Sequence, residues 1–109
     1  TKTIELDPNF AEAYYNRAVD RGEAEDYQGA IADYTKAIAL DPNYAEAYFN
    51  RAYDRSEVKD YEGAIADYTK VIELAPDAAE AYFNRGMARA KLGDIEGAKE
   101  DTNYAKEIA

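Results

Sequence analysis

The sequence repeats itself every 34 residues, and this period limits the possible folds more than any other feature of the chain. The copies begin at Ala11, Ala45 and Ala79. The first two copies agree at about two-thirds of their positions, while the third agrees through its first half and then diverges. A period of this length is typical of arrays in which each copy is one small unit that stacks on its neighbours. Residues 1–6 match residues 35–40, so we expect the chain to open within the last helix of a further copy.

Each copy has the apolar spacing of two helices joined by a turn. In the first copy, recurring residues are spaced at i, i+4 and i+7 on each helix. They are Tyr14, Ala18 and Arg21 on the first helix and Ala30, Tyr34 and Ala37 on the second. Three prolines, Pro8, Pro42 and Pro76, each end the second helix of a copy. An aspartate precedes that helix, where its side chain can cap free amide groups, at Asp26, Asp60 and Asp94.

These positions resemble the signature of the tetratricopeptide repeat (TPR) family over nearly the whole chain. The signature places a large aromatic, a small residue, an alanine, a second aromatic and a proline at fixed spacing. In the first copy these are Tyr14, Ala18, Ala30, Tyr34 and Pro42, and in the second Tyr48, Ala52, Ala64, Tyr68 and Pro76. The third copy has Tyr82, Gly86 and Ala98, with Thr102 in place of the second aromatic.

The resemblance implies an all-α, right-handed superhelical solenoid of antiparallel helical hairpins. One hairpin cannot bury its apolar face alone, whereas stacked hairpins can. We expect one domain over 1–109, with the end of a preceding helix and turn in 1–10 and repeats at 11–44, 45–78 and 79–109. The small residues Ala18, Ala52 and Gly86 should let the helices approach closely, beside the large Tyr14, Tyr48 and Tyr82.

Two features depart from the family pattern. The third copy has Gly93 where the first helix turns into the second, but the first two copies have Glu25 and Lys59. A left-handed backbone costs a side chain other than glycine about 1 kcal/mol, so we expect these two turns to be weaker or differently shaped. Asp20 and Asp54 replace small residues, next to arginines in the sequence. They are expected to form Arg–Asp pairs on the helix flank or, together with weak turns, to favour exchange of helices between chains.

The resemblance also implies that the first helix of each hairpin lines a concave groove. Residues spaced about i, i+3, i+4 and i+7 share one stripe of that helix. These candidate groove residues are Glu12, Tyr15, Asn16 and Val19, then Glu46, Phe49, Asn50 and Tyr53, and finally Glu80, Phe83, Asn84 and Met87. Glu23, Glu57 and Lys91 continue the stripe.

Three rows within this stripe suggest peptide binding, and each has a structural alternative. The asparagine row can pair with both groups of a peptide backbone, or it can bond neighbouring helices. The aromatic row of Tyr15, Phe49 and Phe83 can contact a ligand or pack between adjacent first helices. Val19, Tyr53 and Met87 differ between copies, which is expected of side-chain pockets but also of sequence drift.

The net charge limits the classes of partner that the chain is expected to bind. The chain has 13 Lys and Arg against 23 Asp and Glu, a net charge of −10. We therefore expect a protein or peptide partner that is neutral to basic with apolar side chains, although the acidic face could serve solubility alone. Nucleic acid and anionic membrane surfaces are poor partners for such a chain. No motif specifies the compartment, and a soluble cytoplasmic location is favoured.

Catalysis, a cofactor and a metal site are not expected. The chain has neither His nor Cys, and it contains no glycine-rich phosphate loop or calcium loop. The family's clamp for acidic chaperone tails uses Lys, Asn, Asn, Lys and Arg. At the matching positions this chain has Tyr15, Val19, Asn50, Glu80 and Asn84, so only Asn50 agrees and no binding of such tails is expected.

The sequence therefore predicts a protein-interaction module that captures a peptide segment of a partner in its concave groove. The alternative is a structural scaffold that associates with itself, as a dimer or end to end. Fold alone does not separate these two functions.

Overall fold

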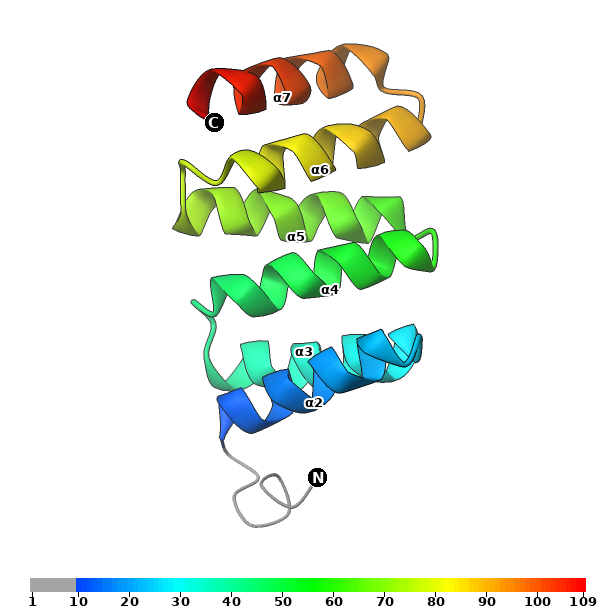
Figure 1. Ribbon diagram of the computed structural model, residues 1–109, viewed down its shortest axis with the longest axis vertical. Coiled ribbons are helices and arrows are strands. Elements are labelled where there is room, and N and C mark those ends of the chain that lie inside the picture. Colours follow the sequence, from blue (N-terminus) through cyan, green and yellow to red (C-terminus); the bar gives the residue numbers. More distant parts are fainter. Residues whose placement is uncertain (1–9) are drawn as a thin grey trace.

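The computed structural model describes residues 10–109, which form six helices and no strand. The helices are α2 (Ala11–Glu23), α3 (Tyr27–Leu40), α4 (Ala45–Glu57), α5 (Tyr61–Leu74), α6 (Ala79–Lys91) and α7 (Ile95–Ile108). They stack one above another along an elongated molecule of 47 × 25 × 18 Å (Figure 1). Each helix packs on the helices before and after it in the chain. The expected all-α solenoid of helical hairpins is confirmed, while the expected helix in 1–10 falls almost entirely outside the described residues.

The second helix of every hairpin begins with an aspartate cap, as the sequence predicts. Asp26 accepts a hydrogen bond from the backbone amide of Gly29 at 3.1 Å. In the same way Asp60 accepts from Gly63 at 3.0 Å, and Asp94 accepts from Gly97 at 2.9 Å. A Cβ atom at Gly29 would collide with the capping carboxylate, so glycine at this position permits the cap. The helices also end where proline predicts: α3 ends at Leu40 and α5 at Leu74. Pro8 lies outside the described residues.

The three turns inside the hairpins share one backbone geometry. Glu25 and Lys59 have φ angles of 64° and 67°, in the same left-handed region as Gly93 at 89°. In each turn the residue that follows the left-handed one donates its backbone amide to the carbonyl oxygen five residues earlier, at 2.7–2.9 Å. Asp26 does so in the first hairpin. The expectation of differently shaped turns is therefore wrong. The turn requires this conformation, and Glu25 and Lys59 adopt it despite the cost of a Cβ atom there.

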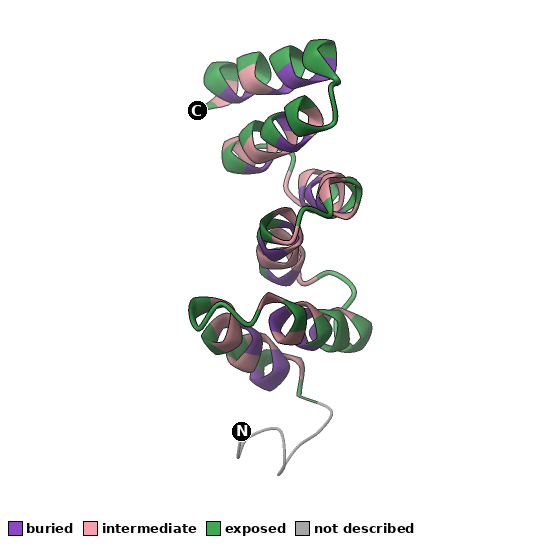
Figure 2. Cartoon of the chain, turned by 90° about the vertical axis from the view of Figure 1, so that its right-hand side faces the viewer, coloured by how far each residue is buried: buried purple, intermediate pink, exposed green. Residues whose placement is uncertain are grey.

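Small residues and tyrosines form the core between the helices. Ala18 and Ala52 are fully buried. A Cβ atom on Gly86 would lie 3.0 Å from the carbonyl oxygen of Ala98 on α7, so this position also permits close approach. Tyr34 and Tyr68 are buried from the second helices. Buried residues line the surfaces where the helices face each other, and exposed residues cover the outside (Figure 2).

Arginines of each first helix pair with an aspartate of the following helix. In the second hairpin, Arg51 donates from Nε and Nη2 to both carboxylate oxygens of Asp67, at 2.9 and 2.8 Å, and Arg55 adds a contact at 2.9 Å. The equivalent clusters are Arg17 and Arg21 with Asp33, and Arg85 and Arg89 with Asp101.

This pairing corrects the prediction for the helix flank. The arginines were expected to pair with Asp20 and Asp54 on their own helices. Asp20 is exposed instead, and Asp54 is buried without an ion pair among the described residues. Side chains three residues apart on one helix are neighbours. A buried carboxylate on the facing helix is screened less by solvent, and it offers both of its oxygens to a guanidinium.

Candidate functional site

The candidate groove residues lie on the first helix of each hairpin but differ in exposure. The glutamates Glu12, Glu46 and Glu80 are exposed. Tyr53, Phe83 and Met87 are about half exposed, each between 46% and 52%. The remaining candidates are half-buried apart from Asn16, which is exposed. The stripe is thus partly surface and partly packed against neighbouring helices.

The aromatic row is divided between packing and exposure. The Tyr15 ring stacks on Tyr44 at 4.9 Å between ring centroids and tilts against Tyr34 at 5.7 Å. Phe49 packs edge-on against Tyr68 at 5.5 Å. The third copy has Thr102 at the position of this second-helix tyrosine, and Phe83 is 46% exposed. Phe83 is therefore the member of the row that is most open to a ligand.

The asparagine row is partly used inside the molecule. The Asn50 amide donates to the hydroxyl of Tyr15 on the preceding first helix at 2.8 Å. Burial raises the pKa of the Tyr68 hydroxyl to about 12, while hydrogen bonding with Asn84 and Ser56 acts in the opposite direction. Bonding between neighbouring helices, one of the two alternatives for this row, thus occurs at Asn50.

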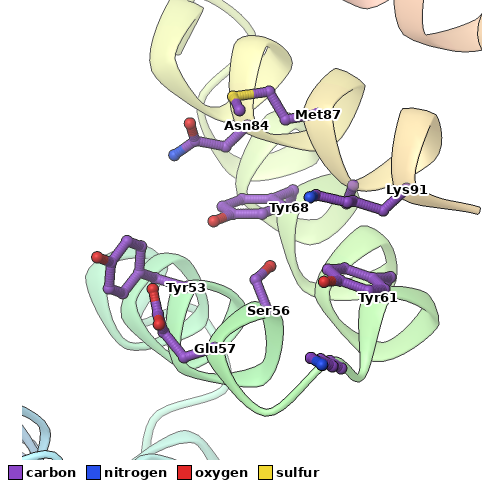
Figure 3. A pocket seen from close by; sticks show the side chains of 10 residues that line it. Tyr53, Ser56, Glu57, Tyr61, Tyr68, Asn84, Met87 and Lys91 are labelled. Atoms are coloured by element: carbon purple, nitrogen blue, oxygen red, sulfur yellow. The ribbon is translucent and has the colours of Figure 1, made fainter.

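A pocket of about 400 Å³ lies between α4, α5 and α6. Figure 3 shows Tyr68 of α5 near its centre, with Tyr53, Ser56 and Glu57 of α4 on one side and Asn84, Met87 and Lys91 of α6 on the other. Tyr61, Lys59 and Ala88 complete the lining. This α4–α6 pocket brings together three candidate groove residues, Tyr53, Asn84 and Met87, from two consecutive repeats.

A second pocket repeats the first, one copy earlier in the chain. It has about 340 Å³ and lies between α2, α3 and α4. Its lining is Val19, Gly22, Glu23, Glu25, Tyr27, Tyr34, Asn50, Tyr53 and Asp54. Each of these positions is 34 residues before a lining position of the α4–α6 pocket. The repeat thus produces a series of equivalent pockets, and this α2–α4 pocket contains the candidates Val19, Asn50 and Tyr53.

A third hollow, of about 530 Å³, lies between α4, the end of α5 and the start of α6. Its lining is mostly alanine and valine, and it includes the candidates Glu46, Phe49 and Glu80. The four other candidates, Glu12, Tyr15, Asn16 and Phe83, lie outside these three sites. The candidate residues expected to form one continuous stripe are therefore divided among three separate hollows and the surface outside them.

Sequence reasoning missed several residues of the pockets. Tyr27 and Tyr61 begin the second helices, and Gly22 and Ser56 lie near the ends of the first. Periodicity within a single helix cannot find them, because the pockets form between three helices. A comparison of the copies at an offset of 34 residues would have shown that the pairs 22/56, 25/59 and 54/88 change in size or charge.

Asp54 has the most perturbed carboxyl group of the site. Only 5% of the residue is exposed, and its Oδ2 atom has no hydrogen-bond partner. Burial and, to a lesser degree, the charge of Glu57 raise the pKa of Asp54 from 3.8 to about 6. Glu57 also raises the pKa of Tyr53, with a smaller contribution from burial. The α2–α4 pocket therefore carries a negative potential.

Between residues 10 and 109, no group of three or more acidic side chains is arranged to hold a metal ion. In the same part of the chain no helix is long and apolar enough to cross a membrane.

Stacked helical hairpins with equivalent pockets define an α-helical repeat protein. Residues 23–53 and 58–93 match a sequence profile described as TPR repeat, and residues 79–108 match a profile described as tetratricopeptide repeat. These matches cover more than half of the chain, so it belongs to the tetratricopeptide repeat family. Proteins of this family are protein-interaction modules. A search of curated protein sequences finds no match.

Solved structures agree with this assignment. The crystal structure of MamA is similar with a TM-score of 0.93 and 30% identity, over 96% of this chain and 61% of that chain. The chain thus spans about three-fifths of MamA. The second TPR of Spaghetti (RPAP3), bound to the HSP90 peptide SRMEEVD, has a TM-score of 0.87 and 31% identity over 91% of this chain and 92% of that one. The Arabidopsis OM64 TPR domain has a TM-score of 0.86 and 28% identity over 90% and 81% of the two chains.

Proposed function

We propose that this chain captures a peptide segment of a partner protein in the groove formed by α2, α4 and α6. The single observation that carries the proposal is the pair of equivalent pockets, which are lined by tyrosines and one asparagine each at an offset of 34 residues. Successive side chains of an extended peptide could enter successive pockets. The relative bound to SRMEEVD supports peptide capture by this fold.

The exposed apolar residues would contribute most to affinity. Tyr53 lines both pockets, Met87 shares the α4–α6 pocket with it, and Phe83 on α6 is about half exposed. Burial of such side chains against a peptide is favourable at about 25 cal/mol per Å² of apolar surface. Asn16 and Asn84 would contact the peptide backbone, whereas Asn50 contributes mainly by holding Tyr15 in place. This role is one of binding, and no catalytic step is assigned to the chain.

A peptide-display selection tests this function. The chain is compared with a Tyr53→Ala/Met87→Ala variant, which removes two exposed side chains and leaves the core intact. The matched control is Leu92→Ala/Ile95→Ala, two equally exposed apolar residues outside the pockets. We expect a motif that enriches on the parent and the control and drops at least about tenfold on the pocket variant. Equal enrichment of the motif on all three chains would rule out peptide capture in the groove.

Self-association remains the second candidate, and one observation favours it. Leu92 and Ile95 are each 50% exposed at the turn of the last hairpin, and neither residue lines the three pockets. If these two side chains mediate association, light scattering across concentration would show a mass above 12.2 kDa for the parent chain. The Leu92→Ala/Ile95→Ala variant would then be monomeric while its display enrichment stays unchanged.

A further inference from the structure

The Asp54 carboxylate is buried without an internal partner, and this calls for an explanation. Among the described residues, its Oδ2 is the buried side-chain oxygen that lacks a hydrogen bond. An unpaired buried carboxylate is costly, because burial favours the neutral form and removes the stabilisation by water. Such groups in native proteins are commonly found at functional sites.

The neighbouring arginines do not compensate the charge of Asp54. Arg55 follows it in the sequence, but its guanidinium contacts Asp67 at 2.9 Å and Asp60 at 3.7 Å. Arg21 contacts Asp33 at 3.1 Å and Asp26 at 4.0 Å. Both cations therefore have carboxylates of their own, and Asp54 instead lines the α2–α4 pocket beside Gly22.

The α2–α4 pocket is acidic throughout and aromatic on its walls. Three carboxylates line the pocket, those of Glu23, Glu25 and Asp54. No lysine or arginine is among the lining residues. Its walls include three tyrosines, Tyr27, Tyr34 and Tyr53. Burial raises the pKa of Tyr34 first, and the charge of Asp54 raises it further. The carboxylates thus repel negative charge that forms at the pocket wall, and they attract positive charge for the same reason.

The equivalent pocket one repeat later has the opposite charge balance. Ala88 occupies the position of Asp54, and Lys59 and Lys91 occupy those of Glu25 and Glu57. The α4–α6 pocket is lined by one carboxylate, Glu57, and two ammonium groups. The buried carboxylate is therefore a property of one pocket and is not required by the repeat fold.

We propose that the α2–α4 pocket binds a cationic side chain of the partner peptide, preferentially arginine, against the carboxylate of Asp54. The guanidinium supplies the hydrogen-bond donors that Asp54 lacks, and Glu23 and Glu25 add attraction at the rim. Arginine is favoured over lysine because its planar group stacks on tyrosine rings and pairs with carboxylates through two donors. This inference deepens the proposed peptide capture and rests on it for its biological meaning, but the chemistry of the pocket can be tested without a peptide.

The test uses a small probe, N-acetyl-arginine N-methylamide, titrated into the ¹⁵N-labelled chain at physiological salt. The control probe is N-acetyl-citrulline N-methylamide, which has the same shape without the charge. We expect amide shifts that saturate at Gly22, Glu23 and Asp54, and at least about tenfold weaker binding of the citrulline probe. The pKa of Asp54, followed by ¹³C NMR, should fall when the arginine probe is bound, because a nearby cation favours the carboxylate.

Two variants separate the pocket from the general acidity of the chain. Asp54→Asn keeps the side-chain shape and should weaken arginine binding at least about tenfold. Asp20→Asn removes the same charge at the equivalent exposed position of the preceding repeat and should leave binding unchanged. Shifts spread evenly over all acidic residues, or equal binding by both variants, would overturn the inference. If the arginine probe binds as expected but display finds no peptide, then peptide capture fails while the pocket assignment stands.

Discussion

At the scale of single residues, the arginine–aspartate clusters show how charged groups hold two helices of a hairpin together. Each buried aspartate on a second helix accepts hydrogen bonds from arginines of the first helix. Arg51 and Arg85 also reach Thr35 and Thr69 of the preceding repeat, both at 3.1 Å. Each guanidinium additionally lies over a tyrosine of its own helix, as Arg51 does over Tyr48 at 5.6 Å. One polar residue thus connects helices within a repeat and between repeats.

Removal of one carboxylate from such a cluster should destabilise the chain strongly. Asp67→Ala leaves Arg51 and Arg55 half-buried without their common partner, so we expect a loss of about 3–5 kcal/mol in the free energy of unfolding. Urea denaturation followed by circular dichroism measures it. The exposed Asp20→Ala serves as the control and should change stability by less than about 0.5 kcal/mol. An Asp67→Ala variant as stable as this control would contradict a structural role for the cluster.

The buried Asp54 should make stability depend on pH in the direction opposite to that of a salt-bridged aspartate. Its pKa is about 6 in the folded chain and near 3.8 when exposed, so the folded state binds the proton more tightly. Stability from this group is fully present below about pH 4 and is lost as the pH rises to about 6. Replacement by Asn removes the ionisation, so Asp54→Asn should match the parent near pH 4 and exceed it by about 3 kcal/mol at pH 7.

Denaturation of the two chains at several pH values tests this difference. The charged groups around Asp54 are Glu23 of α2, Glu25 of the turn and Glu57 of α4, and all three are present in both chains. Their own titration therefore cancels in the comparison. A stability difference that stays constant between pH 4 and pH 7 would show that Asp54 titrates normally.

At the scale of helices and turns, the local signals of the sequence and the structure agree closely. The capping aspartates and the prolines act within a few residues of the helix ends, so their effects can be read from the sequence. The turn is set by its hydrogen bonds rather than by the residue type, since Glu25, Lys59 and Gly93 share it. The turns differ in backbone strain, because Glu25 and Lys59 have a Cβ atom in the left-handed conformation and Gly93 does not.

Glycine at the two strained turns should therefore stabilise the chain. Glu25→Gly and Lys59→Gly remove a left-handed side chain at φ 64° and 67°, with an expected gain of about 0.5–1 kcal/mol each. Gly93→Ala, at φ 89°, should cost about 1 kcal/mol. Thermal unfolding measures all three. Ala24→Gly, at a neighbouring position with φ −85°, is the control and should give no gain. A gain that is equal at Ala24 would show that strain is not the cause.

At the scale of the whole molecule, the proposed peptide capture depends on the net charge of the chain. The chain carries a charge of −10, and the glutamates Glu12, Glu46 and Glu80 repeat along the exposed side of the first helices. Such a field steers cationic partners towards the groove and slows anionic ones. Within this field the two equivalent pockets differ in local charge, so charge alone can set the position of a peptide along the groove.

The acidic peptide SRMEEVD, which is bound by a relative of similar fold, should not bind this chain. Glu80 occupies a position that is cationic in the family's clamp, and of the clamp residues only Asn50 is shared. Isothermal titration should give a Kd weaker than about 1 mM, which corresponds to less than about 4 kcal/mol of binding free energy. The second TPR of Spaghetti serves as the positive control for the peptide. Micromolar binding to this chain would refute the argument from charge.

The sequence by itself determined the fold, the helix pairs and the caps. These follow from a 34-residue period and from signals that act between residues close in the chain. It also placed most of the pocket-lining tyrosines and asparagines on the right elements, because those residues recur once per copy.

Only the tertiary structure decided which charges meet. The arginines could pair with aspartates on their own helix or on the next, and packing of the second helix brings Asp67 to Arg51, 16 residues away. The same packing leaves Asp54 buried without a partner and makes one pocket acidic and the next mixed. The physical reason is that burial and pairing depend on three helices at once, and no spacing along a single helix contains that information.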